Sequence, residues 1–344
     1  MIRPYARLLS AAALIALFVP VFKAAAQQHV PPAPDSSAQQ APAAPEQPAA
    51  EPAAPAPAAP VFPKPDPADF TAALPTKDTV DSFLTANWGY DDTRIWQVQA
   101  IQKTEVDGVS KVTVLVGDKT GKQKPGAFAF FVMPDGKHII TGDQIMVFGA
   151  HPFADTKAKL QQEANGPYRG SPAKDLELVE FADFQCPHCK EAQANMDKLV
   201  EDFPKARIVF QVFPIASIHP QSVRAAEYGL CVNKLGSSTA FFQYAAAVFE
   251  GQDGLGTADG ATLTLNSAVV KAGLDPEKVA ACTADPAIKA NVDASVKLAT
   301  DVGVNQVPIL AINGHEVPAN IPYDVLKKIV EFQAKLDSTG ASAQ

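Results

Sequence analysis

The stretch that decides the fold is LELVEFADFQCPHC, residues 176–189. Its first part, Leu176–Phe181, is largely apolar with weak alternation, which is typical of a strand at a central position in a sheet. The next segment, Cys189–Phe203, carries apolar residues at helical spacing and stops at a proline. The sequence therefore places Cys186 and Cys189 where a buried strand passes into the first turn of an amphipathic helix.

A cysteine at such a turn is expected to be reactive. The thiolate is the nucleophile, and the free N–H groups and positive dipole end of a helix N-terminus stabilise its charge. At such positions, and in Cys-x-x-Cys motifs, the thiol pKa falls from about 8.5 to roughly 3.5–7.5. We predict that Cys186 exchanges disulfides with a substrate and that Cys189, one helical turn further on, resolves the mixed disulfide. His188 is expected to stabilise the Cys186 thiolate if it is cationic or donates a hydrogen bond.

Proton transfer at Cys189 needs a nearby base. Glu180, on the preceding strand and facing the start of the helix, is the candidate. A lone glutamate in a strand more often lies at a sheet edge or in an ion pair, so this structural interpretation of Glu180 stays open.

A Cys-x-x-Cys motif also occurs as half of a zinc site and as a purely structural disulfide. Zinc would need two more ligands, and the remaining cysteines, Cys231 and Cys282, stand apart without short-spaced partners. A structural disulfide would not require the strand-to-helix position. We therefore expect no metal, and no cofactor apart from the redox-active disulfide itself.

The chain has four cysteines, which allow three pairings. Their spacing divides them most naturally into a local reactive pair, Cys186 and Cys189, and a long-range structural pair, Cys231 and Cys282. An even number of cysteines is compatible with folding in an oxidising compartment.

The N-terminus has the features of a secretory signal peptide, which we predict over residues 1–26. Arg3 and Arg7 precede an apolar run of about 15 residues, and small residues follow it at Ala24-Ala25-Ala26. The run is shorter than the roughly 20 residues that a spanning helix needs, so cleavage is favoured over retention as a membrane anchor. We predict a periplasmic or otherwise extracytoplasmic protein.

Composition and turn residues divide the rest of the chain. Residues 27–75 are rich in alanine and proline and are predicted to be a disordered linker. Residues 76–158 combine one helix with strands separated by Gly-containing turns, which predicts a small α+β domain. Residues 170–338 follow the order β–α–β, a helix-rich insertion, then β–β–α, which predicts an α/β domain.

The net charge of −8, without clustered Lys and Arg, argues against nucleic acid as a partner.

The motif Cys186-Pro187-His188-Cys189 resembles the active site of the DsbA family of bacterial periplasmic dithiol oxidases. The resemblance covers roughly residues 172–336 and implies a thioredoxin-like fold with a helical insertion. It implies an active-site role for Glu180, six residues before the first cysteine. It also implies that Val307 and Pro308 contact an extended substrate, because the family has a cis proline at this point.

This resemblance implies an exported thiol–disulfide oxidoreductase, and the dipeptide Pro187-His188 favours oxidation of the substrate. Reduced or misoxidised exported proteins would be the substrates, and a quinone-linked membrane partner would reoxidise the pair. The stretch from Ile218 to Cys231 resembles a branch of the family that carries a second, structural disulfide.

The first domain resembles the dimerisation domain of the DsbC and DsbG isomerases, over about residues 78–150, through the hairpin Pro134–Asp143. That resemblance implies a homodimer formed through this domain. A dimeric disulfide isomerase or reductase is therefore the alternative function. A third alternative, from a different class, is a chaperone-like or scaffold module in which the disulfide is only structural.

Overall fold

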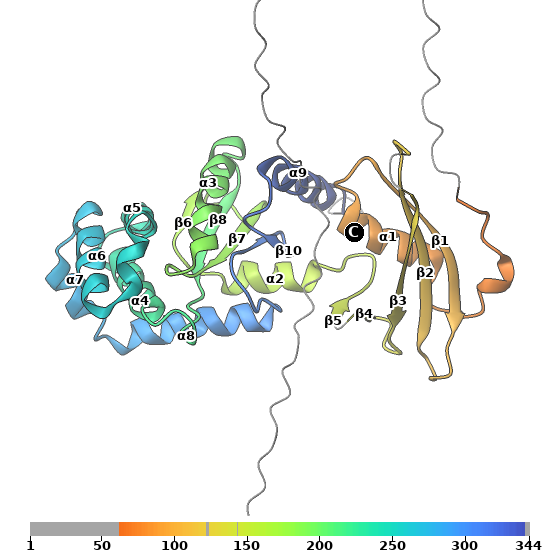
Figure 1. The fold of residues 1–344 in the computed structure, drawn as a ribbon, viewed down its shortest axis with the longest axis horizontal. Helices are drawn as coiled ribbons and strands as arrows, with labels where there is room; N and C mark the ends of the chain where they lie inside the picture. Colours follow the sequence, from red (N-terminus) through yellow and green to blue (C-terminus); the bar gives the residue numbers. More distant parts are fainter. Residues whose placement is uncertain (1–61, 122–123, 143, 341–344) are drawn as a thin grey trace, which may run out of the picture. The chain divides into compact units, whose positions relative to one another are not determined.

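The computed structural model describes residues 62–121, 124–142 and 144–340. Within them, two five-stranded sheets organise two domains (Figure 1), with strand orders β1-β2-β3-β4-β5 and β10-β9-β7-β8-β6. The predicted signal peptide, residues 1–26, and most of the predicted linker lie outside the described residues. None of the described helices combines the length and the apolar character that a membrane span needs.

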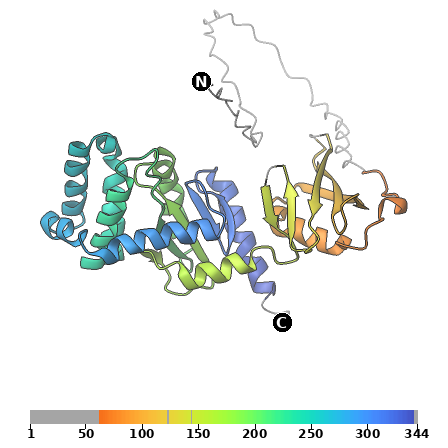
Figure 2. The same ribbon diagram turned by 90° about the horizontal axis from the view of Figure 1, so that it is seen from below.

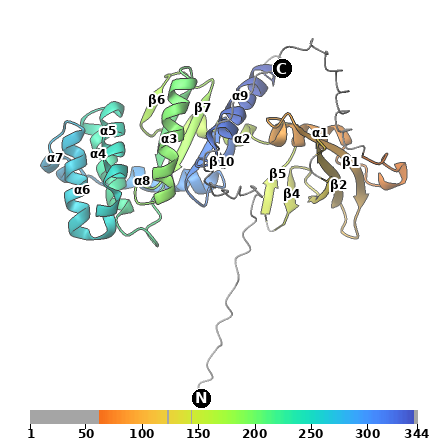
Figure 3. The same cartoon turned by 45° about the horizontal axis from the view of Figure 1, so that its top comes forward.

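The first domain is an antiparallel meander with one helix packed on it. Its strands are β1 (Arg94–Lys103), β2 (Ser110–Asp118), β3 (Gly126–Val132), β4 (His138–Thr141) and β5 (Gln144–Val147). Helix α1 (Lys77–Trp88), labelled in Figure 3, is capped by the Thr76 side chain. It buries Val80 and Leu84 in the core of the first domain. This is the small domain of one helix and several strands that the sequence predicts, with β5 as an additional strand.

The predicted linker extends too far, because residues 62–75 are ordered on the first domain. Phe70 packs against the core of the first sheet, and the N–H of Ala72 donates to the carbonyl of Ile101 at 3.0 Å. The Ser110 hydroxyl donates to the carbonyl of Leu74 at 2.6 Å. The composition did not reveal this segment because its few apolar residues stand among prolines, whereas backbone hydrogen bonds to a strand do not depend on side-chain type.

The second domain is a sheet between two layers of helices. Its strands are β6 (Tyr168–Gly170), β7 (Glu177–Ala182), β8 (Arg207–Val212), β9 (Ile309–Ile312) and β10 (His315–Pro318). One face carries α3 (Pro187–Asp202) and α9 (Tyr323–Gly340), and the other carries α2 (Ala154–Glu163) and α8 (Pro286–Asp301). Strand β7 pairs in parallel with β8 and antiparallel with β9, and all its residues are buried, as its apolar run predicts.

A helical insertion separates β8 from α8 and β9. Its helices are α4 (Ser222–Leu235), α5 (Ser238–Glu250), α6 (Ala258–Lys271) and α7 (Pro276–Cys282). Figure 1 shows them gathered beside the sheet, and Figure 2 shows α8 leading back from them along the sheet. Phe184, which follows β7, lies in their core, where its ring stacks on Phe210 at 5.2 Å and meets Tyr244 edge-on at 5.6 Å. The insertion therefore anchors the chain just before the cysteine pair.

The second domain begins earlier than the predicted residue 170. Leu160 and Ala164, in and after α2, share a core with Val179 of β7, and β6 pairs antiparallel with β8. The sequence signal was weak because Leu160 is the only buried residue of α2 and because β6 is too short to show alternation.

Candidate active site

Cys186 lies where the chain leaves β7 and enters α3. It caps the helix in an extended conformation (φ −80°, ψ 121°), and Pro187 takes the first helical turn, where a missing N–H is tolerated. The carbonyl of Cys186 accepts hydrogen bonds from the N–H groups of Cys189 (3.1 Å) and Lys190 (3.3 Å). Both cysteines are free thiols, with exposed fractions of 6% for Cys186 and 0% for Cys189.

The surroundings of Cys186 favour its thiolate. A hydrogen bond from the Cys189 thiol lowers the pKa of Cys186 most, and burial opposes this effect. The backbone N–H groups of Cys189 and His188 and the positive charge of His219 lower it further, so that the pKa of Cys186 is about 6. Cys186 therefore has the properties of a nucleophile at neutral pH.

Cys189 has the opposite character. Burial raises the pKa of its thiol far above the ordinary range, and its hydrogen bond to Cys186 raises it further. The N–H of Asp183 donates to Sγ of Cys189 at 3.4 Å. Cys189 lies within the apolar cluster that also holds Phe184. One sulfur of the pair is thus stabilised as a thiolate, and the other is kept as a protected thiol.

Glu180 is a fully buried carboxyl group beside this helix. Alternation along β7 places it on the same face as Leu178, which packs towards α3. Gln193 of α3 donates from Nε2 to Oε1 of Glu180 at 2.7 Å and to the carbonyl of Cys189 at 3.1 Å. Burial raises the pKa of Glu180 to about 7, against the opposing charge of Arg169. Its Oε2 has no hydrogen-bond partner among the described residues and can accept a proton.

His188 is exposed, and its imidazole bonds to Glu191. Nδ1 lies 2.9 Å from Oε2 of Glu191, and this carboxylate raises the pKa of His188, with a smaller contribution from the Cys186 thiolate. The backbone N–H of His188 lowers the pKa of Cys186. The contribution of this residue to Cys186 therefore includes its main chain as well as its ring.

Val307 and Pro308 precede β9 and are joined by a cis peptide bond. Val307 packs against the apolar cluster that contains both active-site cysteines. Val307 also packs against the core between β7 and α8, so it lies where two apolar clusters of the second domain meet.

Asp183 and His219 also lie at the pair, although the sequence analysis did not single them out. Asp183 is 1% exposed, and its Oδ2 lies 2.8 Å from Nδ1 of His219. An acidic residue in the apolar stretch directly before Cys186 was an available signal for Asp183. His219 lies in the stretch from Ile218 to Cys231, which the sequence analysis connected with a second disulfide and not with the active site, and 36 residues separate it from Asp183. The sequence did indicate Gln193, because a residue four positions after Cys189 lies on the same face of the helix as this cysteine.

Cys231 and Cys282 form a disulfide within the helical insertion. It joins α4 to the end of α7, with Cα atoms 5.9 Å apart and a sequence separation of 51. Cys231 is fully buried in the cluster that also contains Cys186 and Cys189. The cross-link therefore belongs to the scaffold around the cysteine pair.

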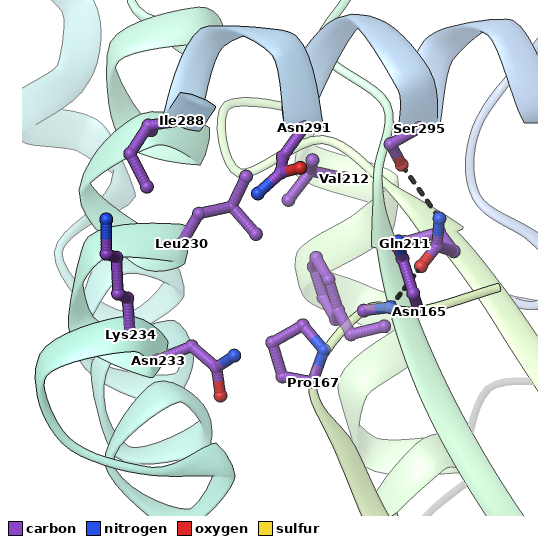
Figure 4. A pocket seen from close by; sticks show the side chains of 12 residues that line it. Asn165, Pro167, Gln211, Val212, Leu230, Asn233, Lys234, Ile288, Asn291 and Ser295 are labelled. Carbon is purple, nitrogen blue, oxygen red and sulfur yellow. Dashed lines mark hydrogen bonds between the residues drawn. The ribbon is translucent and has the colours of Figure 1, made fainter. Parts of the chain in front are cut away.

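A cavity of about 300 Å³ lies between β8, α4 and α8 (Figure 4). Gln211 donates to Ser295 Oγ at 3.1 Å and accepts from the N–H of Gly166 at 2.6 Å, so its amide ties three segments together at the cavity wall. The lining includes neither active-site cysteine nor Glu180. We assign no part in the cysteine chemistry to this cavity.

Residues 162–332 match the profile of a protein family described as Thioredoxin. The match covers the second sheet, the active-site helix and the insertion. The predicted fold class is thereby confirmed: a thioredoxin-like α/β domain with a helical insertion, preceded by a small β-sheet domain.

Similar solved structures cover about half of this chain. A thioredoxin-like oxidoreductase from Silicibacter pomeroyi DSS-3 is 27% identical, with a TM-score of 0.44 over 52% of this chain and 96% of that chain. The thiol-disulfide exchange protein alpha-DsbA2 from Wolbachia pipientis is 25% identical, with a TM-score of 0.44 over 52% and 95%. A periplasmic thioredoxin-like protein from Salmonella enterica serovar Typhimurium is 23% identical, with a TM-score of 0.42 over 52% and 96%.

The curated relatives are much longer proteins. The Na(+)/H(+) antiporter NhaA 3 of Salinispora tropica is 28% identical over 155 residues, which are 44% of this chain and 22% of the antiporter. NhaA 1 of Salinispora arenicola is 36% identical over 59 residues, which are 17% of this chain and 9% of the antiporter. The chain thus spans about a fifth or less of the length of these relatives.

Proposed function

We propose that the protein is an exported thiol–disulfide oxidoreductase that passes a Cys186–Cys189 disulfide to reduced proteins. The observation that carries the proposal is the contrast between the two thiols. The pKa of Cys186 is lowered to about 6, whereas burial strongly raises that of Cys189. A stabilised thiolate favours the reduced form of the pair, which makes its disulfide a good oxidant.

The reaction begins with the pair oxidised. A substrate thiolate attacks Sγ of Cys186, a mixed disulfide forms, and Cys189 leaves with the electrons of the broken bond. A second substrate thiolate then attacks the substrate sulfur of the mixed disulfide and releases Cys186 as a thiolate. The substrate dithiol thus loses two electrons, which reduce the pair.

Glu180 is proposed to carry the proton for Cys189. A buried sulfur leaves more readily if it is protonated as it leaves, because an isolated buried charge is unfavourable. The pKa of Glu180 is about 7, so the carboxyl group can give a proton at neutral pH and take it back when the pair is reoxidised. Its hydrogen bond to Gln193 holds it next to the turn of Cys189.

Val307 and Pro308 are proposed to contact the substrate chain beside the mixed disulfide. The packing of Val307 against the cluster around the two cysteines supports this role. Backbone hydrogen bonds to an extended peptide do not depend on its side chains, so such a site would accept unfolded proteins of many sequences.

Partners and location follow from the same chemistry. The Cys231–Cys282 disulfide supports folding in an oxidising, extracytoplasmic compartment. Each turnover leaves two electrons on the pair, so continued oxidation of substrates needs an electron acceptor. We propose a quinone-linked membrane protein in this role and reduced or misoxidised exported proteins as substrates.

The test is the redox equilibrium of the full chain with glutathione, followed by trapping of mixed disulfides. We expect a potential nearer to about −120 mV than to about −270 mV. Cys189→Ser should accumulate mixed disulfides with proteins that already carry a disulfide, because the Cys186 thiolate attacks that bond and no Cys189 thiol is present to release the product. Cys186→Ser should form none. If wild-type protein fails to exchange with glutathione, the oxidoreductase proposal is wrong and a scaffold function is favoured.

A dimeric disulfide isomerase is the second candidate, and one feature of the first sheet favours it. Phe131, Ile140 and Ile145 are cross-strand neighbours on β3, β4 and β5, on the face opposite the core. Phe131 is 41% exposed and Ile145 is 69% exposed. Exposed apolar rows of this kind often mark protein interfaces, and β5 lies at the sheet edge. We propose that a second copy of the chain covers this row.

Sedimentation of the full chain tests the dimer. Wild type should sediment as a dimer, and Ile145→Lys should shift it towards the monomer, while Lys111→Glu on the same face serves as a polar-to-polar control. Refolding of a substrate with scrambled disulfides then separates the two functions. Isomerisation that depends on the dimer would favour the second candidate, and a monomeric wild type would exclude it.

A further inference from the structure

Asp183 and His219 form a largely buried hydrogen-bonded pair at the cysteines, and the reaction steps above do not use it. Nδ1 of His219 donates a hydrogen bond of 2.8 Å to Oδ2 of Asp183. The Asp183 side chain is 0% exposed and that of His219 is 15% exposed. Desolvating such a pair is unfavourable, and an apolar pair of similar volume is often as stable. Fold stability alone is therefore a weak reason for its presence.

Asp183 contacts both cysteines through its backbone. Its carbonyl accepts from the N–H of Cys186 at 3.1 Å, and its own N–H donates to Sγ of Cys189 at 3.4 Å. Its second carboxylate oxygen, Oδ1, accepts from the N–H of Gln185 at 2.8 Å. The position of this one residue is thus coupled to the positions of both sulfurs.

The segment that carries His219 is hydrogen-bonded at two further points to the residues directly before Cys186. The N–H of Ile215 donates to Oδ2 of Asp183 at 2.8 Å. The N–H of Gln221 donates to Oε1 of Gln185 at 2.8 Å. His219 lies between these two attachments in the sequence, and its ring bonds to Asp183, whose carbonyl accepts from the N–H of Cys186. The charge of His219 also lowers the pKa of Cys186.

We propose that Asp183 is a positioning residue and His219 a charge partner of Cys186, and that together they set the oxidising strength of the cysteine pair. This inference rests on the proposed exchange function. The Asp183 carboxylate accepts the Nδ1 proton and so fixes the orientation of the ring. A positive charge beside Cys186 lowers the free energy of the reduced, thiolate form relative to the disulfide. The exchange equilibrium then shifts towards oxidation of the substrate.

The test compares four full-length proteins in equilibrium with glutathione. They are wild type, His219→Gln, His219→Lys and His138→Gln. The first variant removes the charge, and the second retains a positive charge at the site. His138→Gln is a matched control, because His138 also bonds to an aspartate, Asp135, at 2.6 Å but lies in the first domain.

We expect His219→Gln to lower the equilibrium constant for reduction of the pair at least about tenfold, which corresponds to about 30 mV for this two-electron couple. The thiolate absorbance of Cys186 should titrate at higher pH in the same variant. His219→Lys should stay within about threefold of wild type, and His138→Gln should not differ from it.

A constant for His219→Gln within about threefold of wild type would overturn the proposal. A constant for His219→Lys as low as that for His219→Gln would also overturn it, because charge would then not be the determinant. If His219→Gln does not fold, His219→Asn takes its place as a second neutral side chain, with the same expected loss. Failure of the exchange function itself looks different, since wild type would then not equilibrate with glutathione at all.

Discussion

Gln193 Nε2 lies 2.7 Å from Oε1 of Glu180 and also reaches the carbonyl oxygen of Cys189, at 3.1 Å. One side chain thus connects a buried acid on a strand to the helical turn that carries the less accessible sulfur. Because an amide can donate two hydrogen bonds at once, the contact fixes the acid without neutralising it. The proposed movement of a proton between Glu180 and Cys189 would then need no change of the fold.

The first prediction concerns Glu180→Gln. Burial raises the folded-state pKa of Glu180 to about 7 from an ordinary value of 4.5, so the native state binds the proton more tightly than the unfolded chain does. The protein therefore loses stability as the pH rises from 4.5 to 7. The loss is about 3 kcal/mol at roughly 1.4 kcal/mol per pKa unit. Glu180→Gln should therefore be more stable than wild type at pH about 8 by up to that amount, and nearly equal to it at pH about 4.

Urea unfolding of the reduced protein at both pH values measures this difference. Glu191→Gln is the matched control, since its carboxylate is exposed and pairs with His188. Equal stability of Glu180→Gln and wild type at the higher pH would show that the buried carboxyl group does not resist ionisation. The variant should also release Cys189 more slowly when a substrate thiolate attacks the Cys186–Cys189 disulfide, which stopped-flow exchange measures.

The second prediction concerns the rate at which Cys186 is alkylated. Iodoacetamide reacts with thiolates, so the rate should rise with pH with a midpoint near the Cys186 pKa of about 6. Cys189 should remain unmodified over the same range because burial raises its pKa and shields its sulfur. Mass spectrometry of the reduced protein after a short pulse measures both. Modification of Cys189 at a similar rate would contradict the asymmetry of the pair.

The third prediction concerns the turn between β9 and β10. Gly314 has φ +88°, and a Cβ there would lie 2.5 Å from the carbonyl oxygen of Phe153, whereas Gly303 has φ +89° with open space around it. Gly303→Ala should cost about 1 kcal/mol through backbone strain alone. Gly314→Ala should cost clearly more, because α2 must also move. Thermal unfolding of both variants checks this, and equal losses would refute the close contact.

The fourth prediction concerns the Cys231–Cys282 cross-link. Removing it as Cys231→Ala/Cys282→Ala opens a loop with a separation of 51 residues, for which the chain-entropy relation gives a loss of about 4 kcal/mol. Denaturant unfolding measures the loss. The alkylation rate of Cys186 in the folded variant should stay near that of wild type. A large fall in that rate would mean that the cross-link shapes the reactive pair as well as the scaffold.

The sequence predicted the parts of the fold whose signals are local. The apolar run of β7, the cysteine pair at the first turn of α3 and the order of elements after it all follow from short-range patterns. The three-residue strand β6 and helix α2 escaped because neither has a strong periodicity of its own. Their places in the fold depend on contacts with β8 and with the core around Val179.

The candidate site also has a part that the sequence could predict and a part that it could not. Cys186, Cys189 and Glu180 are close in the sequence, and a strand followed by a helix is enough to bring them together. His219 joins them through the chain reversal after β8, and its bond to Asp183 spans 36 residues. No pattern within one segment can indicate such a contact, because the two partners belong to different elements of the sheet and the insertion.

The order of the cysteines along the chain has a further consequence. Cys186 and Cys189 precede Cys231 and Cys282, which form the cross-link seen in the insertion. When a chain emerges from its N-terminal end, neighbours that appear first can be joined first. Pairing in order of appearance would join Cys186 to Cys189 and leave Cys231 for Cys282, which is the cross-link that the structure shows.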